Sequence, residues 1–175
     1  MKVSFNIDLK NASISELAFI ASHITECNKL HRLARMAVKL EKASPGNIDV
    51  FYLKTALAEN NCSDSRVLEL LSKDSDPLIR ECVVKAHNTP TSVLDALMYD
   101  TSFEVARSYP LAHNVSKDEI GVMLERIISG DVDITDTFKG DIVSLVRQYQ
   151  SSKYVDEEDK ERLGDWLTRT IRLVG

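Results

Sequence analysis

Cysteine and histidine are the residue types in this chain with the most reactive side chains, and their spacing limits the chemistry open to them. Cys27 and His31 lie four residues apart, so on a helix their side chains share one face and can touch. In such a pair the imidazole can take the thiol proton and make the sulfur a nucleophile. The same two positions also fit an apolar helix with one polar neighbour. We favour this second interpretation, in which neither residue is catalytic.

His87 and His113 form a second candidate pair, separated by 113 − 87 = 26 residues. If they occupy equivalent places in stacked units, they should lie about 10 Å apart, the distance between packed helices. That arrangement would allow a pH-sensitive or ligand-binding pair, but we favour a role in capping a helix end or satisfying a turn carbonyl. Cys62 or Cys82 could also meet His87 across a turn. Because no second ligand pair stands at metal-binding spacing, we expect no zinc site.

Arg80 and Arg107 are candidate contacts for an acidic partner, because a guanidinium group suits the recognition of carboxylates and phosphates. Internal ion pairs are their favoured use, since several carboxylates are close in sequence, namely those of Asp64, Asp74, Asp95 and Asp100. The chain has no Gly-x-Gly-x-x-Gly, Walker or His-Glu-x-x-His motif. We therefore predict that the protein is not an enzyme and has no catalytic residue, no cofactor and no metal.

The composition is that of an ordinary globular protein with room for one domain. The 175 residues are 43% hydrophobic and 28% charged, and the formal net charge of −5 does not favour nucleic acid as the partner. The sequence has no apolar run of about 18 residues and no signal-peptide core, so we expect no membrane partner. Three cysteines without close spacing fit reduced thiols better than disulfides. These features together predict a cytoplasmic location.

The elements that would position these residues recur along the chain. The segment NNCSDSRVLELLSKD (60–74) resembles AHNTPTSVLDALMYD (86–100), at an offset of 86 − 60 = 26 residues. A third pass at the same offset begins with HNVSKD (113–118). The apolar positions that recur are Leu68, Leu94 and Ile120, and Leu71, Leu97 and Met123. A period of this length is typical of helix pairs that stack and bury one another's apolar faces.

The repeated segments resemble the variant leucine-rich repeat family, which belongs to the HEAT-like α-solenoids. The matching residues are Asn88-Thr89-Pro90, Leu68 with Leu71, Asp74-Ser75-Asp76-Pro77 and Ile79-Arg80. The second unit departs from the family pattern, because Phe103 stands in place of the proline and Ala106 in place of the arginine. The resemblance covers about residues 60–125 and implies an all-α fold, a short right-handed superhelical stack of helix pairs. It implies little about activity, because such folds host many functions.

We expect a single α-solenoid domain over residues 1–175. Its parts are N-terminal helices (13–59), repeats of about 26 residues (60–128), and C-terminal capping helices (141–175) that close the stack.

The first ten residues differ from the rest, because apolar and polar residues alternate there in the period-two pattern of a short β-strand. The apolar positions are Val3, Phe5, Ile7 and Leu9. The arm could pack along the first helices, pair with a second copy or a binding partner, or pair with DVDIT (131–135).

The leading functional prediction is a non-enzymatic protein–protein interaction module, a regulator or inhibitor that acts by binding and that a phage or plasmid could encode. The candidate partner contacts are Arg80, Arg107, His87, His113, Val3, Phe5 and Ile7. One alternative is a nucleic-acid-binding HEAT-like protein related to alkylpurine DNA glycosylases, which needs a basic face. Its basic residues would be Arg32, Arg35, Lys39, Arg80 and Arg107. The other alternative is a homo-oligomeric structural protein joined through the N-terminal strand.

Overall fold

The computed structural model describes residues 11–113, 115–134, 137 and 139–173, and over these residues the chain is all-helical. This part contains ten α-helices, one short 3-10 helix and no strand. The predicted all-α class is therefore confirmed. The strand predicted for residues 1–10, with Val3, Phe5 and Ile7, lies outside the described residues. None of the helices in the described part combines the length and apolar character needed to cross a bilayer.

The helices follow one another with short connections. In chain order they are α1 (Ile14–His23), α2 (Cys27–Ala43), α3 (Ile48–Glu59), α4 (Ser65–Leu71), α5 (Pro77–Lys85), α6 (Thr91–Leu97), α7 (Phe103–Ser108), η1 (Tyr109–Leu111), α8 (Lys117–Ser129), α9 (Lys139–Ser151) and α10 (Glu157–Leu173).

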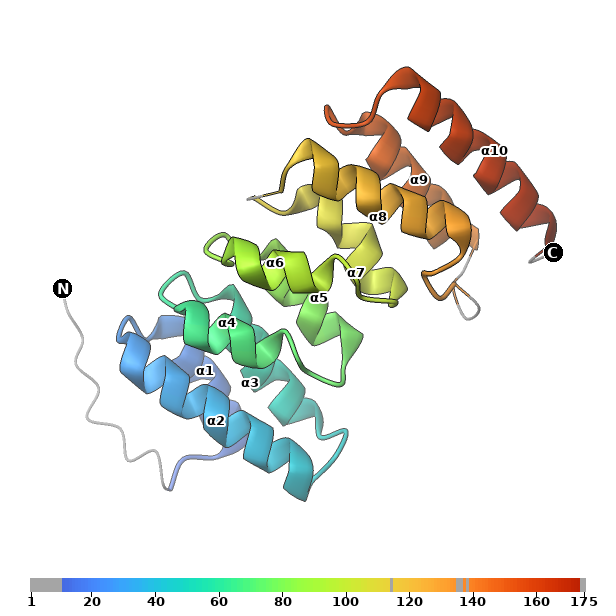
Figure 1. The fold of residues 1–175 in the computed structure, drawn as a ribbon. Coiled ribbons are helices and arrows are strands. Elements are labelled where there is room, and N and C mark those ends of the chain that lie inside the picture. Colours follow the sequence, from blue (N-terminus) through green and yellow to red (C-terminus); the bar gives the residue numbers. More distant parts are fainter. Residues whose placement is uncertain (1–10, 114, 135–136, 138, 174–175) are drawn as a thin grey trace.

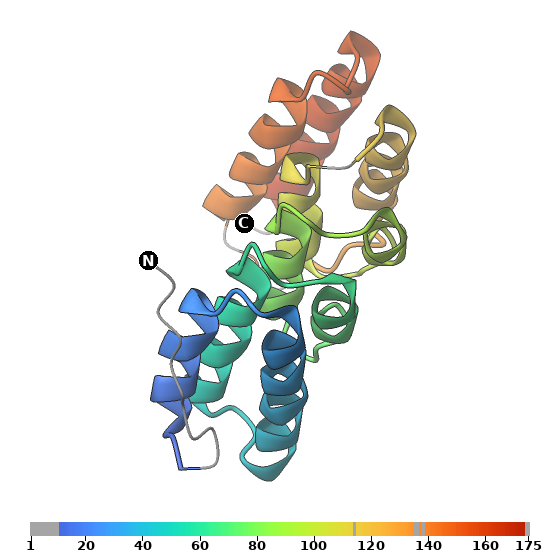
Figure 2. The same ribbon diagram turned by 90° about the vertical axis from the view of Figure 1, so that its left-hand side faces the viewer.

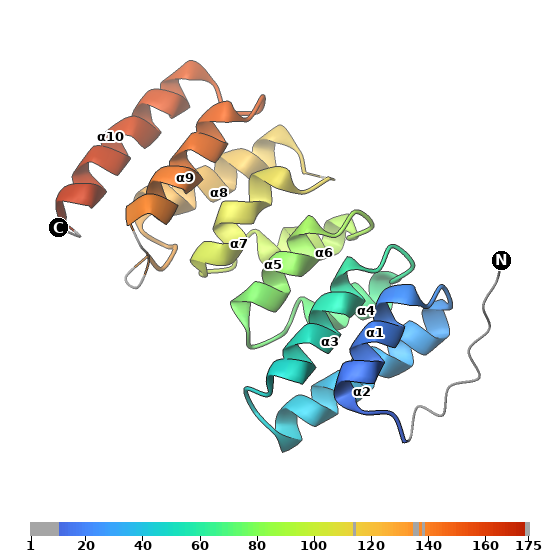
Figure 3. The ribbon, with the colours of Figure 1, turned by 180° about the vertical axis from the view of Figure 1, so that it is seen from behind.

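The helices lie in two rows, seen from opposite sides in Figures 1 and 3. One row contains α1, α3, α5, α7 and α9, and its neighbouring members α1, α3, α5 and α7 contact one another in sequence. The other row contains α2, α4, α6 and α8, while α10 packs against α9 at the end of the molecule. Figure 2 shows that the molecule bends with the first row on the inside. We call the two rows the inner row and the outer row.

Local hydrogen bonds set where the helices begin. The Ser13 hydroxyl accepts the backbone N–H of Glu16, whose carboxylate accepts the backbone N–H of Ser13 at 2.7 Å, so a capping box opens α1. In α6 the N-cap lies one residue later than the residue type of Thr89 suggests. Pro90 is the N-cap there instead of Thr89, because the Thr89 hydroxyl donates to the Val83 carbonyl at 2.5 Å.

The period seen in the sequence recurs in the contacts. The six apolar positions that recur are all buried in α4, α6 and α8: Leu68, Leu71, Leu94, Leu97, Ile120 and Met123. Ser63 donates its hydroxyl to the Leu57 carbonyl at 2.6 Å, and Thr89 makes the equivalent bond to Val83, with both donor and acceptor one repeat further on. Equivalent side chains therefore occupy equivalent surroundings.

The segment between α8 and α9 is bonded to the turn that precedes α7. Gly130 ends α8 with a φ of +88°, a left-handed conformation that a glycine adopts without a steric penalty. The backbone N–H of Asp133 then donates to the carbonyl of Thr101 at 2.7 Å, next to an isolated bridge between Ser102 and Asp133. Helix α9 begins at Lys139, slightly before the start of the predicted capping helices.

Candidate functional site

Arg80 is held inside the molecule. Its Nε and Nη2 donate to the two carboxylate oxygens of Asp100 at 2.6 and 3.0 Å, and its Nη1 donates to the carbonyls of Asp74 and Ser75. Burial by itself raises the pKa of Asp100, but the hydrogen bonds from Arg80 and Ser102 outweigh burial and leave that pKa below its ordinary value. The internal ion pair favoured by the sequence is therefore present, and the guanidinium donors are already engaged.

An equivalent ion pair lies 26 residues earlier in the chain. Lys54 Nζ lies 2.7 Å from Asp74 Oδ2, and these residues precede Arg80 and Asp100 by 80 − 54 = 26 and 100 − 74 = 26 positions. The Lys54 and Asp74 side chains are only 3% and 5% exposed. In both repeats, then, a basic residue of the inner row is bonded to the acidic turn that follows the next outer helix.

Arg107 belongs to a second polar cluster, around Glu81. Arg107 Nη2 donates to Glu81 Oε1 at 3.0 Å, and Ser108 and Lys85 donate to the same oxygen at 2.6 and 2.7 Å. Burial raises the pKa of Glu81, but the three donors together outweigh it and the pKa is lowered. Arg107 and Glu81 stand one repeat apart and link α7 to α5, so this arginine too has an internal partner.

His87 and His113 come much closer together than the sequence suggests. Their ring centroids are 4.4 Å apart, with the ring planes at 74°, and both residues are exposed. The expected separation of about 10 Å is wrong, because that distance joins helix axes. These side chains project from two neighbouring turns and converge.

The three cysteines form no catalytic or metal-binding cluster in the described part of the chain. No hydrogen bond joins Cys27 to His31 there, and no group of three or more His, Cys, Asp and Glu residues is arranged to hold a metal ion. Cys82 is half-buried, and burial raises the pKa of its thiol to about 11, which makes it a poor nucleophile at neutral pH.

Exposed apolar side chains gather on the first three helices of the inner row. Ile48 and Tyr52 lie one turn apart on α3, and Leu78 on α5 stands one repeat after Tyr52. Phe19 lies on α1, opposite the residues that this helix buries. The exposed fractions are 60% for Ile48, 57% for Tyr52, 42% for Leu78 and 63% for Phe19. We call these four residues the inner-row apolar patch.

Sequence reasoning missed this patch because it assigned apolar residues to the core by default. A signal was present, since Tyr52 and Leu78 occupy equivalent repeat positions and fall off the buried stripes of α3 and α5.

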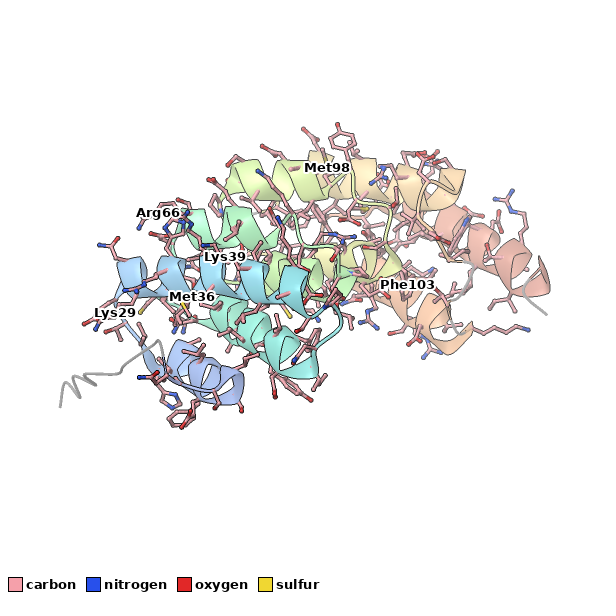
Figure 4. The ribbon with its side chains drawn as sticks, turned by 90° about the horizontal axis from the view of Figure 1, so that it is seen from below. Lys29, Met36, Lys39, Arg66, Met98 and Phe103 are labelled. Carbon is pink, nitrogen blue, oxygen red and sulfur yellow. The ribbon has the colours of Figure 1, made fainter. Side chains whose placement is uncertain are left out.

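A groove of about 430 Å³ runs along the solvent face of α2, at the end of the outer row. Its lining consists of Asn28, His31, Arg32, Arg35, Met36 and Lys39. Figure 4 shows Met36 and Lys39 together on α2, with Lys29 nearer its beginning and Arg66 on the adjacent α4. Arg32, Arg35 and Lys39 form no ion pair with any described residue, whereas Arg80 and Arg107 do. The five basic residues considered for nucleic acid thus do not act as one free basic face.

A second groove of about 590 Å³ lies between the turn after α6 and helix α8. Its walls include Tyr99, which is 64% exposed, and Val122. The Arg126 guanidinium lies 5.8 Å from the centroid of the Tyr99 ring and donates to the carbonyls of Met98 and Asp100. Because Tyr99 lies on the outer row, it provides an exposed aromatic residue remote from the inner-row apolar patch.

Comparisons of this chain with protein-family models, with curated proteins and with solved structures returned no match.

Proposed function

We propose that this protein is a non-enzymatic protein–protein interaction module of the α-solenoid type, which acts as a regulator or inhibitor by binding its partner in the cytoplasm. The two rows of helices and the regular recurrence of buried side chains, ion pairs and hydroxyl contacts support a right-handed superhelical stack. The resemblance to variant leucine-rich repeats belongs to the same proposal. A stack of this kind offers a long, rigid, curved surface for a partner.

The inner-row apolar patch is the observation that carries this proposal. Phe19, Ile48, Tyr52 and Leu78 leave large apolar surfaces in water on three neighbouring helices, a feature that marks interaction sites. Aromatic side chains such as Tyr52 are enriched among the residues that dominate binding energy at protein interfaces. The partner in this proposal is a protein that covers the patch from the inside of the bend.

A capture experiment with two matched variants tests the proposal. The full chain would be used to capture its partner from the native cell, with mass spectrometry to identify that partner, and the purified pair would then be measured by calorimetry. Tyr52→Ser with Leu78→Ser should weaken binding at least tenfold, through loss of about 1.4 kcal/mol or more of apolar contact. Tyr99→Ser, which removes an equally exposed aromatic residue from the outer row, should leave affinity unchanged. An equal loss of affinity in both variants, or no loss in either, would rule out the patch as the binding site.

A second candidate function, nucleic-acid binding, is favoured by the groove on α2. This helix carries five Lys and Arg residues and one Glu, a local charge of 5 − 1 = +4 in a chain whose net charge is −5. Phosphate contacts from such a surface would weaken steeply as salt rises. Retention of the chain on a DNA column at low salt, abolished when Arg32, Arg35 and Lys39 are changed to Glu, would support this function. Passage of the unmodified chain through the column would exclude it.

A further inference from the structure

His87 and His113 stand at equivalent places on two neighbouring turns. His87 follows α5 and His113 follows η1, and each turn leads from the inner row to the next helix of the outer row. Both rings are exposed, and their centroids are 4.4 Å apart. Neither imidazole belongs to the inner-row apolar patch or to the ion pairs described above.

The separation of the rings matches that of two imidazoles bound to one metal ion. A ring nitrogen binds zinc at about 2.0–2.1 Å, and the ring centre lies about 1.1 Å further away, so each centroid is about 3.2 Å from the metal. Two such centroids 4.4 Å apart subtend an angle of about 90° at the metal, whereas a tetrahedral angle would need a separation of about 5.2 Å. An angle near 90° is the one found in square-planar and tetragonal complexes of Cu²⁺ and Ni²⁺.

Hydrogen bonds hold the turn that carries His87 and the backbone that leads into His113. The Thr89 hydroxyl donates to the Val83 carbonyl, and the amide of Asn88 donates to the Ser63 carbonyl, which fixes the turn of His87. Before His113, the backbone N–H of Ala112 donates to the carbonyl of Tyr109 at 3.1 Å. The backbone positions are therefore set in advance. Rotation of each ring about its Cβ–Cγ bond, which leaves the ring centroid nearly in place, can turn one nitrogen of each ring toward a common point.

We propose that His87 and His113 form a two-histidine site for a divalent transition-metal ion that prefers square-planar or tetragonal coordination, with Ni²⁺ and Cu²⁺ as the best fits. No third His, Cys, Asp or Glu joins the pair among the described residues. The remaining coordination positions are then open to water or to a donor group from another molecule. Because a protonated imidazole cannot bind a metal, binding requires both rings to be neutral.

Titration of the full, untagged chain with Ni²⁺ by calorimetry at pH 8, under reducing conditions, tests this site. The chain has four histidines, so His23→Ala and His31→Ala are matched controls for His87→Ala and His113→Ala. We expect one Ni²⁺ per chain, with affinity at least tenfold lower after loss of either His87 or His113 and unchanged in the two controls. Cys27→Ser, which removes the exposed thiol, should also leave affinity unchanged.

Two results would overturn the proposal. One is Ni²⁺ affinity that survives the loss of either member of the pair, and the other is an equal loss when His23, His31 or Cys27 is replaced. His31 is half-buried and the other replaced side chains are exposed. For each variant, a thermal melt with the same midpoint as the unmodified protein shows that any lost binding is not lost folding.

Discussion

Replacing Lys54 by methionine should destabilise the protein strongly, although it removes only one charge. Lys54 Nζ lies 2.7 Å from Asp74 Oδ2, and both side chains are almost fully buried. At an effective dielectric constant of about 20, the attraction at this distance is about 6 kcal/mol, and the desolvation of the two charges, several kcal/mol each, offsets most of it. Methionine would leave the Asp74 carboxylate desolvated without its cation. We therefore expect the free energy of unfolding to fall by about 3–5 kcal/mol.

Two further variants separate this explanation from a general loss of packing. Lys54→Met combined with Asp74→Leu removes the stranded carboxylate, so it should recover most of the loss, less about 1 kcal/mol for the hydrogen bond that Asp74 accepts from the Asp76 backbone. Arg162→Met breaks two ion pairs of similar length, 2.6 Å to Glu125 and 2.9 Å to Asp159, in which the Arg162, Glu125 and Asp159 side chains are 40%, 58% and 27% exposed. Water screens these pairs, and their loss should together cost less than about 1 kcal/mol.

Urea unfolding followed by circular dichroism gives the free energy for each variant from the midpoint and slope. The reasoning fails if Lys54→Met costs no more than Arg162→Met. It also fails if the double variant is no more stable than Lys54→Met, because the loss would then come from the volume of the side chain.

Three further predictions follow from burial and charge. Leu97→Ala should cost about 2–5 kcal/mol by leaving a cavity, whereas Leu78→Ala at the surface should cost less than about 1 kcal/mol, and thermal melts of the two would show this order. Burial raises the pKa of Glu81, but its hydrogen bonds outweigh burial and lower the pKa; its contribution to stability is therefore present above its ordinary pKa and lost as the pH falls through the lowered value. Urea midpoints between pH 7 and pH 3 should decline less steeply in Glu81→Gln. With the pKa of Cys82 raised to about 11, iodoacetamide at pH 8 should modify exposed Cys27 at least about tenfold faster than Cys82, as measured by peptide mass spectrometry.

The helical class and the buried positions could be predicted because they depend on periodicity. Leu68, Leu94 and Ile120 recur once in each repeat, and each is buried in its helix. The helix boundaries were harder to predict, because they depend on single hydrogen bonds. Thr89 looks like a helix cap by residue type, yet its hydroxyl bonds to a carbonyl of the preceding helix, and the cap falls on Pro90. Whether a threonine hydroxyl accepts an N–H of the next helix or donates to a carbonyl of the preceding one leaves no trace in the sequence pattern.

The candidate surfaces were less predictable than the fold, because they depend on which side chains remain exposed after packing. Arg80 and Arg107 are arginines of the kind that bind partners, but packing placed Asp100 and Glu81 against them. Tyr52 looks like a core residue by type and is exposed. The distance between His87 and His113 was also hard to predict, because it depends on how two turns face each other.

The third segment at the 26-residue spacing departs from the ion-pair pattern of the first two. Moving one repeat on from Arg80 and Asp100 gives Ala106 and Arg126, so the base is missing and the acid has become a base. An aspartate at position 126 would face no cation from position 106, and a half-buried carboxylate without a partner is costly. Arg126 avoids that cost because it donates to the carbonyls of Met98 and Asp100 at 2.5 and 2.9 Å. These bonds join α8 to the turn that carries Asp100. The two changes compensate for each other, because the turn that carries Asp100 keeps a basic partner although the ion pair is not repeated.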